Sequence, residues 1–120
     1  MNTIVLKGEP KSTSHIYKIT CRGRFASMYL SAQGKAIKID YGWQIRQQWK
    51  KQPLKGNVEI IIALYFGTKR KCDWDNFHKL SMDAMTGLVY VDDSQIIRAT
   101  VEKFYEKGNG RIEIDVYELD

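Results

Sequence analysis

Residues 57–67 read NVEIIIALYFG, and this stretch decides the fold. In an extended chain, alternate side chains point to opposite faces. The even-numbered residues from Val58 to Phe66 share one apolar face, whereas Ile61, Ala63 and Tyr65 occupy the other. Because apolar residues on both faces are typical of a strand in the interior of a sheet, we predict a central strand over Asn57–Gly67.

Two further strands are predicted on the C-terminal side, over Ile96–Tyr105 and Arg111–Leu119. Both runs are rich in β-branched and aromatic residues. Asn109-Gly110 lies between them, and both of its residues tolerate a positive φ angle. We therefore predict that the two strands form a hairpin with a tight turn at this pair.

Two helices are predicted, one before and one after the central strand. The first covers Ala32–Lys51, with Ser31 as its N-cap and Pro53 beyond its end. One apolar side chain recurs every fourth residue in it: Ile37, Tyr41, Ile45 and Trp49. The second helix covers Asp75–Thr86, where Asp75 itself can serve as the N-cap.

The N-terminal part adds a strand over Asn2–Lys7 and a hairpin of His15–Cys21 with Phe25–Leu30. The element order is then β, ββ, α, β, α, ββ, which alternates too little for a doubly wound sheet. This order indicates a mixed α/β (α+β) fold, with a largely antiparallel sheet and two main helices. A chain of 120 residues fits one domain, covering residues 1–120.

Charge divides the chain into a basic and an acidic part. Residues 1–71 carry 14 Lys/Arg against 3 Asp/Glu, a net +11, and residues 72–120 carry 5 against 11, a net −6, for +5 overall. A basic half suits a polyanionic partner, because cations that neutralise phosphates release counterions from nucleic acid.

Composition also limits the compartment. No apolar run approaches the roughly 20 residues of a membrane helix, and the N-terminus has no signal-peptide pattern. The two cysteines fit a reducing compartment. We expect a cytoplasmic protein without a membrane partner.

Acidic residues gather after the central strand. Asp73 and Asp75 stand two residues apart, so extended geometry points them the same way. Lys79 and Asp83 follow Asp75 at helical spacing, and Asp92-Asp93 precedes the next strand. Clustered carboxylates repel one another unless a cation intervenes, and their oxygens suit Mg²⁺ or Mn²⁺. Such a metal can activate water for hydrolysis, and Lys79 can stabilise a developing anion.

Each acidic residue also has a structural interpretation. Asp75 can simply cap a helix, Asp83 can pair with Lys79 at the surface, and Asp92-Asp93 can form an ordinary turn. What favours a functional site is the coincidence of the basic triplet Lys69-Arg70-Lys71, two acidic pairs and a lysine within 25 residues. The residues alone do not choose between Asp92 and Asp93.

Three motifs carry a resemblance to a known family. They are RKCDWDNFHKLSMDAM at residues 70–85, GLVYVDDSQI at 87–96, and GEPKS at 8–12. Together they resemble the RusA family of Holliday-junction resolvases. The resemblance implies a RusA-like fold and a Mg²⁺-dependent homodimeric endonuclease, with Mn²⁺ as a possible substitute. It also implies that four-way DNA junctions are resolved by paired symmetric nicks, in recombination and repair.

The resemblance also assigns roles by position. It implies four catalytic residues: Asp73, Asp75, Asp93 and Lys79. The three carboxylates among them would bind the metal. It implies three supporting residues: Asn76, Asp83 and Asp92. We further expect Lys69, Arg70 and Lys71 to contact DNA phosphates close to the active site.

Two alternatives stay open at this stage. One is a nucleic-acid-binding module without catalysis, which would use aromatic side chains for stacking. The other is a less selective metal nuclease acting on flaps or forks. A homodimer is expected because one chain carries one acidic cluster, and a two-fold pair offers one site to each of two strands. Four features are the interface candidates: Tyr41, Trp43, Trp49 and the second face of the Asn57–Gly67 strand.

Overall fold

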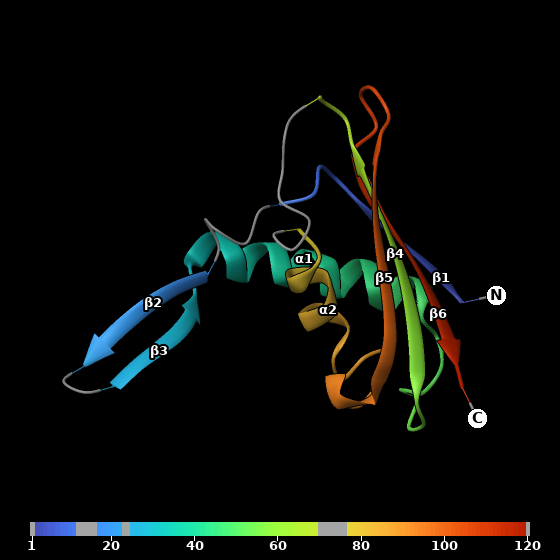
Figure 1. Cartoon of the computed structure of the whole chain (residues 1–120), viewed down its shortest axis with the longest axis horizontal. Coiled ribbons are helices and arrows are strands. Elements are labelled where there is room, and N and C mark those ends of the chain that lie inside the picture. The colour runs from blue at the N-terminus through green and yellow to red at the C-terminus, as the bar shows by residue number, and fades with distance from the viewer. Residues whose placement is uncertain (1, 12–16, 23–24, 70–76, 120) are drawn as a thin grey trace.

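The computed structural model describes residues 2–11, 17–22, 25–69 and 77–119, with the backbone alone described at 17–22 and 25–29 (Figure 1). In chain order the elements are β1 (Thr3–Lys7), β2 (Tyr17–Arg22), β3 (Phe25–Leu30), α1 (Ala32–Gln48), β4 (Val58–Phe66), α2 (Lys79–Met85), the 3-10 helix η3 (Asp93–Gln95), β5 (Ile96–Tyr105) and β6 (Arg111–Glu118). The mixed α/β fold with two main helices is confirmed.

The main sheet has four strands in the order β1-β6-β4-β5, so β4 is an interior strand, as predicted. β4 pairs antiparallel with β6 and parallel with β5, and β6 pairs antiparallel with β1. The sheet is therefore largely antiparallel. β2 and β3 pair with each other in a separate two-stranded sheet, which confirms the N-terminal hairpin.

The predicted hairpin of β5 with β6 is wrong, because β4 lies between these two strands. Their connection crosses the end of β4 and bonds to it. The Glu106 N–H donates to the Phe66 carbonyl at 2.9 Å, and the Gly108 N–H donates to the Gly67 carbonyl at 3.1 Å. Gly108 also takes the positive φ, at 71°, one residue before the predicted pair. The Asn109-Gly110 motif correctly predicted a chain reversal between β5 and β6. The two strands do not pair with each other, because the buried strand β4 lies between them.

The two faces of β4 differ in burial. Its even-numbered residues, from Val58 to Phe66, are at most 5% exposed and belong to a core that both helices join. The other face is only half-buried. There the Arg111 guanidinium lies 3.8 Å from the centroid of the Tyr65 ring, and Phe104 stacks on the same ring at 5.0 Å. The core that includes side chains from both helices is thus built on one face of this strand.

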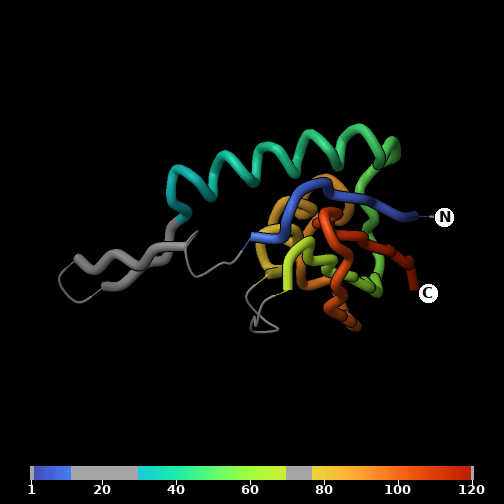
Figure 2. Tube along the Cα trace, turned by 90° about the horizontal axis from the view of Figure 1, so that it is seen from above, coloured from blue at the N-terminus to red at the C-terminus, as the bar shows by residue number. Residues whose placement is uncertain are grey.

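α1 crosses one side of the molecule (Figure 2). It begins as predicted, because the Ser31 hydroxyl oxygen accepts a hydrogen bond from the Gly34 N–H at 3.1 Å. It ends at Gln48 and not at the predicted Lys51, since Trp49 already adopts an extended backbone. The early ending leaves the Trp49 ring buried in the core, at 7% exposure.

Burial also corrects two of the expected interface residues. Tyr41 and Trp49 are core residues of this chain, so neither is available to a second subunit. They complete the apolar stripe of α1 that packs onto the sheet. Trp43, by contrast, is 60% exposed.

α2 starts later than predicted. Phe77 and His78 form a bend, and the helix begins at Lys79, so the prediction Asp75–Thr86 is wrong over those two residues. The Phe77 ring is buried and packs edge-on against Phe66, with 5.1 Å between the centroids. This contact holds the chain in a bend just before α2. The predicted N-cap, Asp75, lies outside the described residues.

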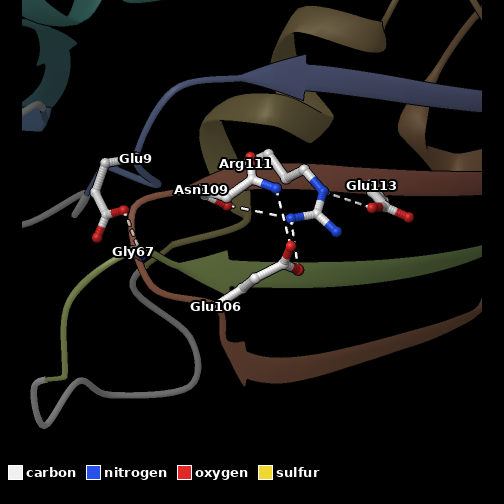
Figure 3. Close-up of polar contacts among 6 residues, drawn as sticks. All are labelled: Glu9, Gly67, Glu106, Asn109, Arg111 and Glu113. Atoms are coloured by element: carbon white, nitrogen blue, oxygen red, sulfur yellow. Dashed lines mark hydrogen bonds and ion pairs between the residues drawn. The ribbon is translucent and has the colours of Figure 1, made fainter.

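The side chain of Glu9, which follows β1, contacts the backbone at the end of β4 (Figure 3). Its Oε1 accepts a hydrogen bond from the Gly67 N–H at 2.7 Å. The neighbouring Gly8 N–H donates to the Gly110 carbonyl at 3.3 Å. A Cβ on Gly110 would collide with the Glu9 carboxylate and lie 2.8 Å from the Glu9 Cα. The close approach of the two backbones therefore requires glycine at position 110.

We predict that Gly110→Ala lowers the free energy of unfolding by about 1–3 kcal/mol, the usual cost of overpacking a tight site. Gly56→Ala is the matched control, because its Cβ would meet the Leu119 carbonyl at an ordinary 3.8 Å. Urea unfolding followed by circular dichroism measures both variants. Equal stability of the two would show that the Glu9 contact does not constrain position 110.

Candidate active site

α2 presents one lysine and one carboxylate on the same face. The Lys79 Nζ lies 3.5 Å from the Asp83 Oδ2, at the helical i, i+4 spacing predicted from the sequence. Their side chains are 52% and 33% exposed. The structural interpretation of Asp83, a surface pair with Lys79, is therefore seen. The pairing also holds the lysine ammonium at a fixed place on the helix surface.

Asp92 has a structural task in the segment that follows α2. Its carboxylate accepts hydrogen bonds from the Ser94 N–H, at 3.3 Å, and from the Ser94 hydroxyl. In return its own N–H donates to the Gln95 Oε1 at 2.8 Å, which completes a capping box around η3. The side-chain and backbone bonds from Ser94 lower the pKa of Asp92. Asp92 is thus committed to shaping the turn.

Asp93 is in a different position, although it is the next residue. It is exposed and begins η3. Within the described part of the chain, its carboxylate makes no hydrogen bond or ion pair. Of the two adjacent aspartates, Asp92 thus has a carboxylate oxygen engaged in the turn, whereas neither carboxylate oxygen of Asp93 has a partner among the described residues.

Gln95 fixes this turn to the rest of the domain. Its Nε2 donates to the carbonyls of Leu54 and Gly56, both at 2.8 Å. Leu54 also forms backbone hydrogen bonds with Val89 and Val91, which lie between α2 and η3. The position of Asp93 is thus set by the connection between α1 and β4, a region far away in the sequence.

Tyr90 links α2 to the aspartate turn, and sequence reasoning did not single it out. It is fully buried, and its hydroxyl donates to the Met82 carbonyl at 2.8 Å. Burial is the main reason that the pKa of Tyr90 rises to about 12. Three carboxylates also raise it: Asp93, Asp83 and Asp92. The Tyr90 hydroxyl bond thus ties the segment that leads to the aspartate turn back to α2.

Several predicted site residues cannot be placed. Asp73, Asp75, Asn76, Arg70 and Lys71 lie outside the described residues. Among the residues that are described, no group of three carboxylate, histidine or cysteine side chains could hold a metal ion. The predicted metal centre therefore stays a prediction.

Lys69 is described, and it lies far from Asp93. β4 and β5 run parallel with Val58 beside Ile96, so η3 adjoins the start of β4 whereas Lys69 follows its end. The nine residues of β4 separate those two ends by roughly 25 Å. The Lys69 Nζ lies 5.4 Å from the centroid of the Tyr105 ring. Its predicted contact with DNA would therefore be remote from Asp93.

Comparison with known proteins finds one matching family. The sequence model of the family described as Endodeoxyribonuclease RusA matches residues 7–117. The chain is 30% identical over 111 residues to a protein named crossover junction endodeoxyribonuclease rusA from Enterobacteria phage 82, covering 92% of this chain and 89% of that one. Proteins of the same name from Escherichia coli K12 and Shigella sonnei are 29% identical with the same coverage.

We predict that the two adjacent aspartates separate in a stability experiment. Asp92→Ala removes the cap of η3 and should lower the melting temperature at pH 7, whereas Asp93→Ala should leave it unchanged. Because the pKa of Asp92 is lowered on folding, its stabilisation is present above the ordinary carboxyl pKa near 3.9 and is lost as the pH falls through the lower folded-state value.

Melting curves of the wild type and both variants, recorded between pH 7 and pH 2, test this prediction. The difference between Asp92→Ala and the wild type should shrink in the most acidic samples. A constant difference across that range would mean that the charge of Asp92 has no part in the cap.

Proposed function

The chain belongs to the RusA family of endodeoxyribonucleases, and from this we propose that it hydrolyses phosphodiester bonds in four-way DNA junctions with the help of Mg²⁺. The family match over residues 7–117 supports the reaction class. The structural observation that carries the proposal is the exposed carboxylate of Asp93, which makes no hydrogen bond or ion pair among the described residues and follows directly on the capping box of Asp92. We further propose that two subunits make paired, symmetric nicks in recombination and repair.

The donor chemistry fits the proposed metal. We propose that Asp73, Asp75 and Asp93 bind it, and the exposed oxygens of Asp93 are hard ligands of the kind that Mg²⁺ and Mn²⁺ prefer. Mg²⁺ keeps several waters, so few carboxylates suffice. When bound, the metal would supply an activated water and offset negative charge at the phosphate.

Lys79 would act on the phosphate directly. Its ammonium is held 3.5 Å from the Asp83 carboxylate and is still half exposed. A cation in that position can stabilise the charge that develops on phosphate oxygens during hydrolysis. We propose that Asp83 positions Lys79, while Asn76 and Asp92 support the site. Asp92 would do so through the capping box that orients Asp93.

The proposed substrate also fits the charge of the protein. Lys69, Arg70 and Lys71 are proposed to contact DNA phosphates; of the three, Lys69 is described and lies beyond the end of β4. No helix in the described part of the chain is long and apolar enough to span a membrane. We propose a cytoplasmic location, where the DNA substrate of such an enzyme is found.

The homodimer is proposed through β5, a strand at the edge of the main sheet. Only Val101 of its ten residues is buried. Ile97, Phe104 and Tyr105 are 57%, 42% and 47% exposed. Exposed apolar side chains on a long edge strand are a liability unless something covers them. A second copy related by a two-fold axis would cover them and bring a second active site to the junction.

We predict cleavage of a labelled four-way junction with Mg²⁺ and none with EDTA. Asp73→Asn and Asp93→Asn should each abolish cleavage yet retain junction binding, because they remove metal-binding charge and leave the DNA-binding cations. Asp92→Asn is the matched control: its amide oxygen can still accept the capping bonds, so most activity should remain. Gel assays on junction, flap and duplex substrates measure cleavage and selectivity. Cleavage in EDTA, or wild-type rates for Asp73→Asn, would contradict the proposal.

We predict a dimer of the 14.0 kDa chain at micromolar concentration, measured by light scattering. Ile97→Lys places a charge on the exposed face of β5 and should shift the mass to that of a monomer. Trp43→Lys changes an equally exposed apolar residue on α1 and should leave the dimer intact. A monomeric wild type would refute the dimer, and dissociation by Trp43→Lys alone would move the interface to α1.

A further inference from the structure

A groove of about 700 Å³ separates α1 from α2. The side of α1 that lines it carries three cations, Lys35, Lys38 and Arg46, and the α2 side carries Asp83. The groove therefore holds three positive charges against one negative charge. Asp83, which also pairs with Lys79, is the residue that the groove shares with the candidate active site.

The charges of α1 are sorted between its two sides. Lys35, Lys38 and Arg46 recur at spacings of three and eight residues, which places them on one helix face. All three are exposed, and within the described residues none of them forms an ion pair. The acidic residue of the helix, Asp40, lines a different hollow beside β1 and accepts a hydrogen bond from the Gln44 Nε2 at 2.9 Å. The groove is thus left with cations that no described carboxylate neutralises.

Small residues give the groove its depth. Gly42 on α1, together with Ala84 and Gly87 at the end of α2, lines it. Glycine is unfavourable inside a helix, yet a Cβ on Gly42 would approach only the Arg46 guanidinium, at 4.0 Å. Packing therefore does not demand glycine at this position. The absence of a side chain at Gly42 instead leaves space for a ligand between the two helices.

We propose that this groove binds the sugar-phosphate backbone of the DNA strand next to the scissile phosphate. The inference rests on the proposed function and extends it by assigning a binding site for the strand. An extended polyanion complements the three cations, and the small residues make room for its backbone. Asp83 lines the groove and pairs with Lys79, whereas Lys69 lies beyond the far end of β4. A strand bound in the groove would therefore pass beside these two site residues.

The first test compares two charge variants with equal net charge. Lys38→Gln/Arg46→Gln alters the groove, and Lys50→Gln/Lys51→Gln alters the other end of the same helical region. Binding is measured in EDTA, so no cleavage intervenes, with a four-way junction and with a single-stranded oligonucleotide. For the groove variant, the slope of log affinity against log salt should fall by about 1.4–1.8, and the affinity should drop on the order of tenfold. The control should retain the wild-type slope.

The second test fills the groove without changing its charge. Gly42→Leu should raise the melting temperature, because leucine has the higher helix propensity, yet it should weaken binding of the oligonucleotide. Gln47→Leu is the matched control, since it adds the same side chain on the side of α1 that faces the other hollow. It should leave DNA binding unchanged. A variant that is more stable and binds less tightly separates a blocked groove from a damaged fold.

The outcomes distinguish this inference from the proposed function. If the wild type does not cleave junctions but the groove variants still bind the oligonucleotide more weakly, the resolvase function is refuted and the groove remains a DNA-binding site. Wild-type affinity and slope in both Lys38→Gln/Arg46→Gln and Gly42→Leu would overturn the groove. A wild type that binds neither DNA would overturn both. A change of oligomeric mass in Gly42→Leu without a change in affinity would instead assign the groove to a second copy of the chain.

Discussion

Burial of one face of β4 is the constraint on which the other elements depend. Five side chains along that face are excluded from water, and each aliphatic one contributes about 1.5–3 kcal/mol through the hydrophobic effect. Both helices contribute side chains to the core on this face. β6 and β5 flank β4, so the backbone hydrogen-bonding groups on both of its edges find partners. The parallel pairing with β5 then places η3, and with it Asp93, beside the start of β4.

A set of partly buried hydrogen bonds links this arrangement to the acidic residues. The Tyr90 hydroxyl bonds to α2, and Gln95 bonds to the connection before β4. The segment between α2 and β5 is consequently held at both ends. Asp92 uses its carboxylate to shape the turn, which leaves the neighbouring Asp93 exposed at a fixed place. The adjacent aspartates thus differ in their surroundings: one carboxylate shapes the turn, and the proposed metal ligand beside it is left exposed.

Local patterns in the sequence predicted the elements well and their pairing less well. The alternation in residues 57–67 and the four-residue spacing of α1 report burial directly, so β4 and α1 were found. Asn109-Gly110 reports a chain reversal, but the partner of each strand depends on β4, which is distant in the sequence. The start of α2 was missed because the buried contact of Phe77 with Phe66 is tertiary. In the site, the pairing of Lys79 with Asp83 follows from helix geometry. The capping role of Asp92 and the hydrogen bond of Tyr90 depend on tertiary structure and had no clear signal in the sequence.

The basic residues show why proximity in sequence is a poor guide to a nucleic-acid surface. Lys69 is only 24 residues from Asp93 in the chain, yet the length of β4 separates them. Lys38 and Arg46 are farther away in sequence but line the same groove as Asp83. These cations have no ion-pair partner among the described residues, so they repel one another, and a glycine in the middle of that helix lowers its propensity by about 1 kcal/mol. Both features weaken the isolated fold. They are consistent with a helix whose outer face is shaped for a phosphate backbone while its inner face is fixed by β4.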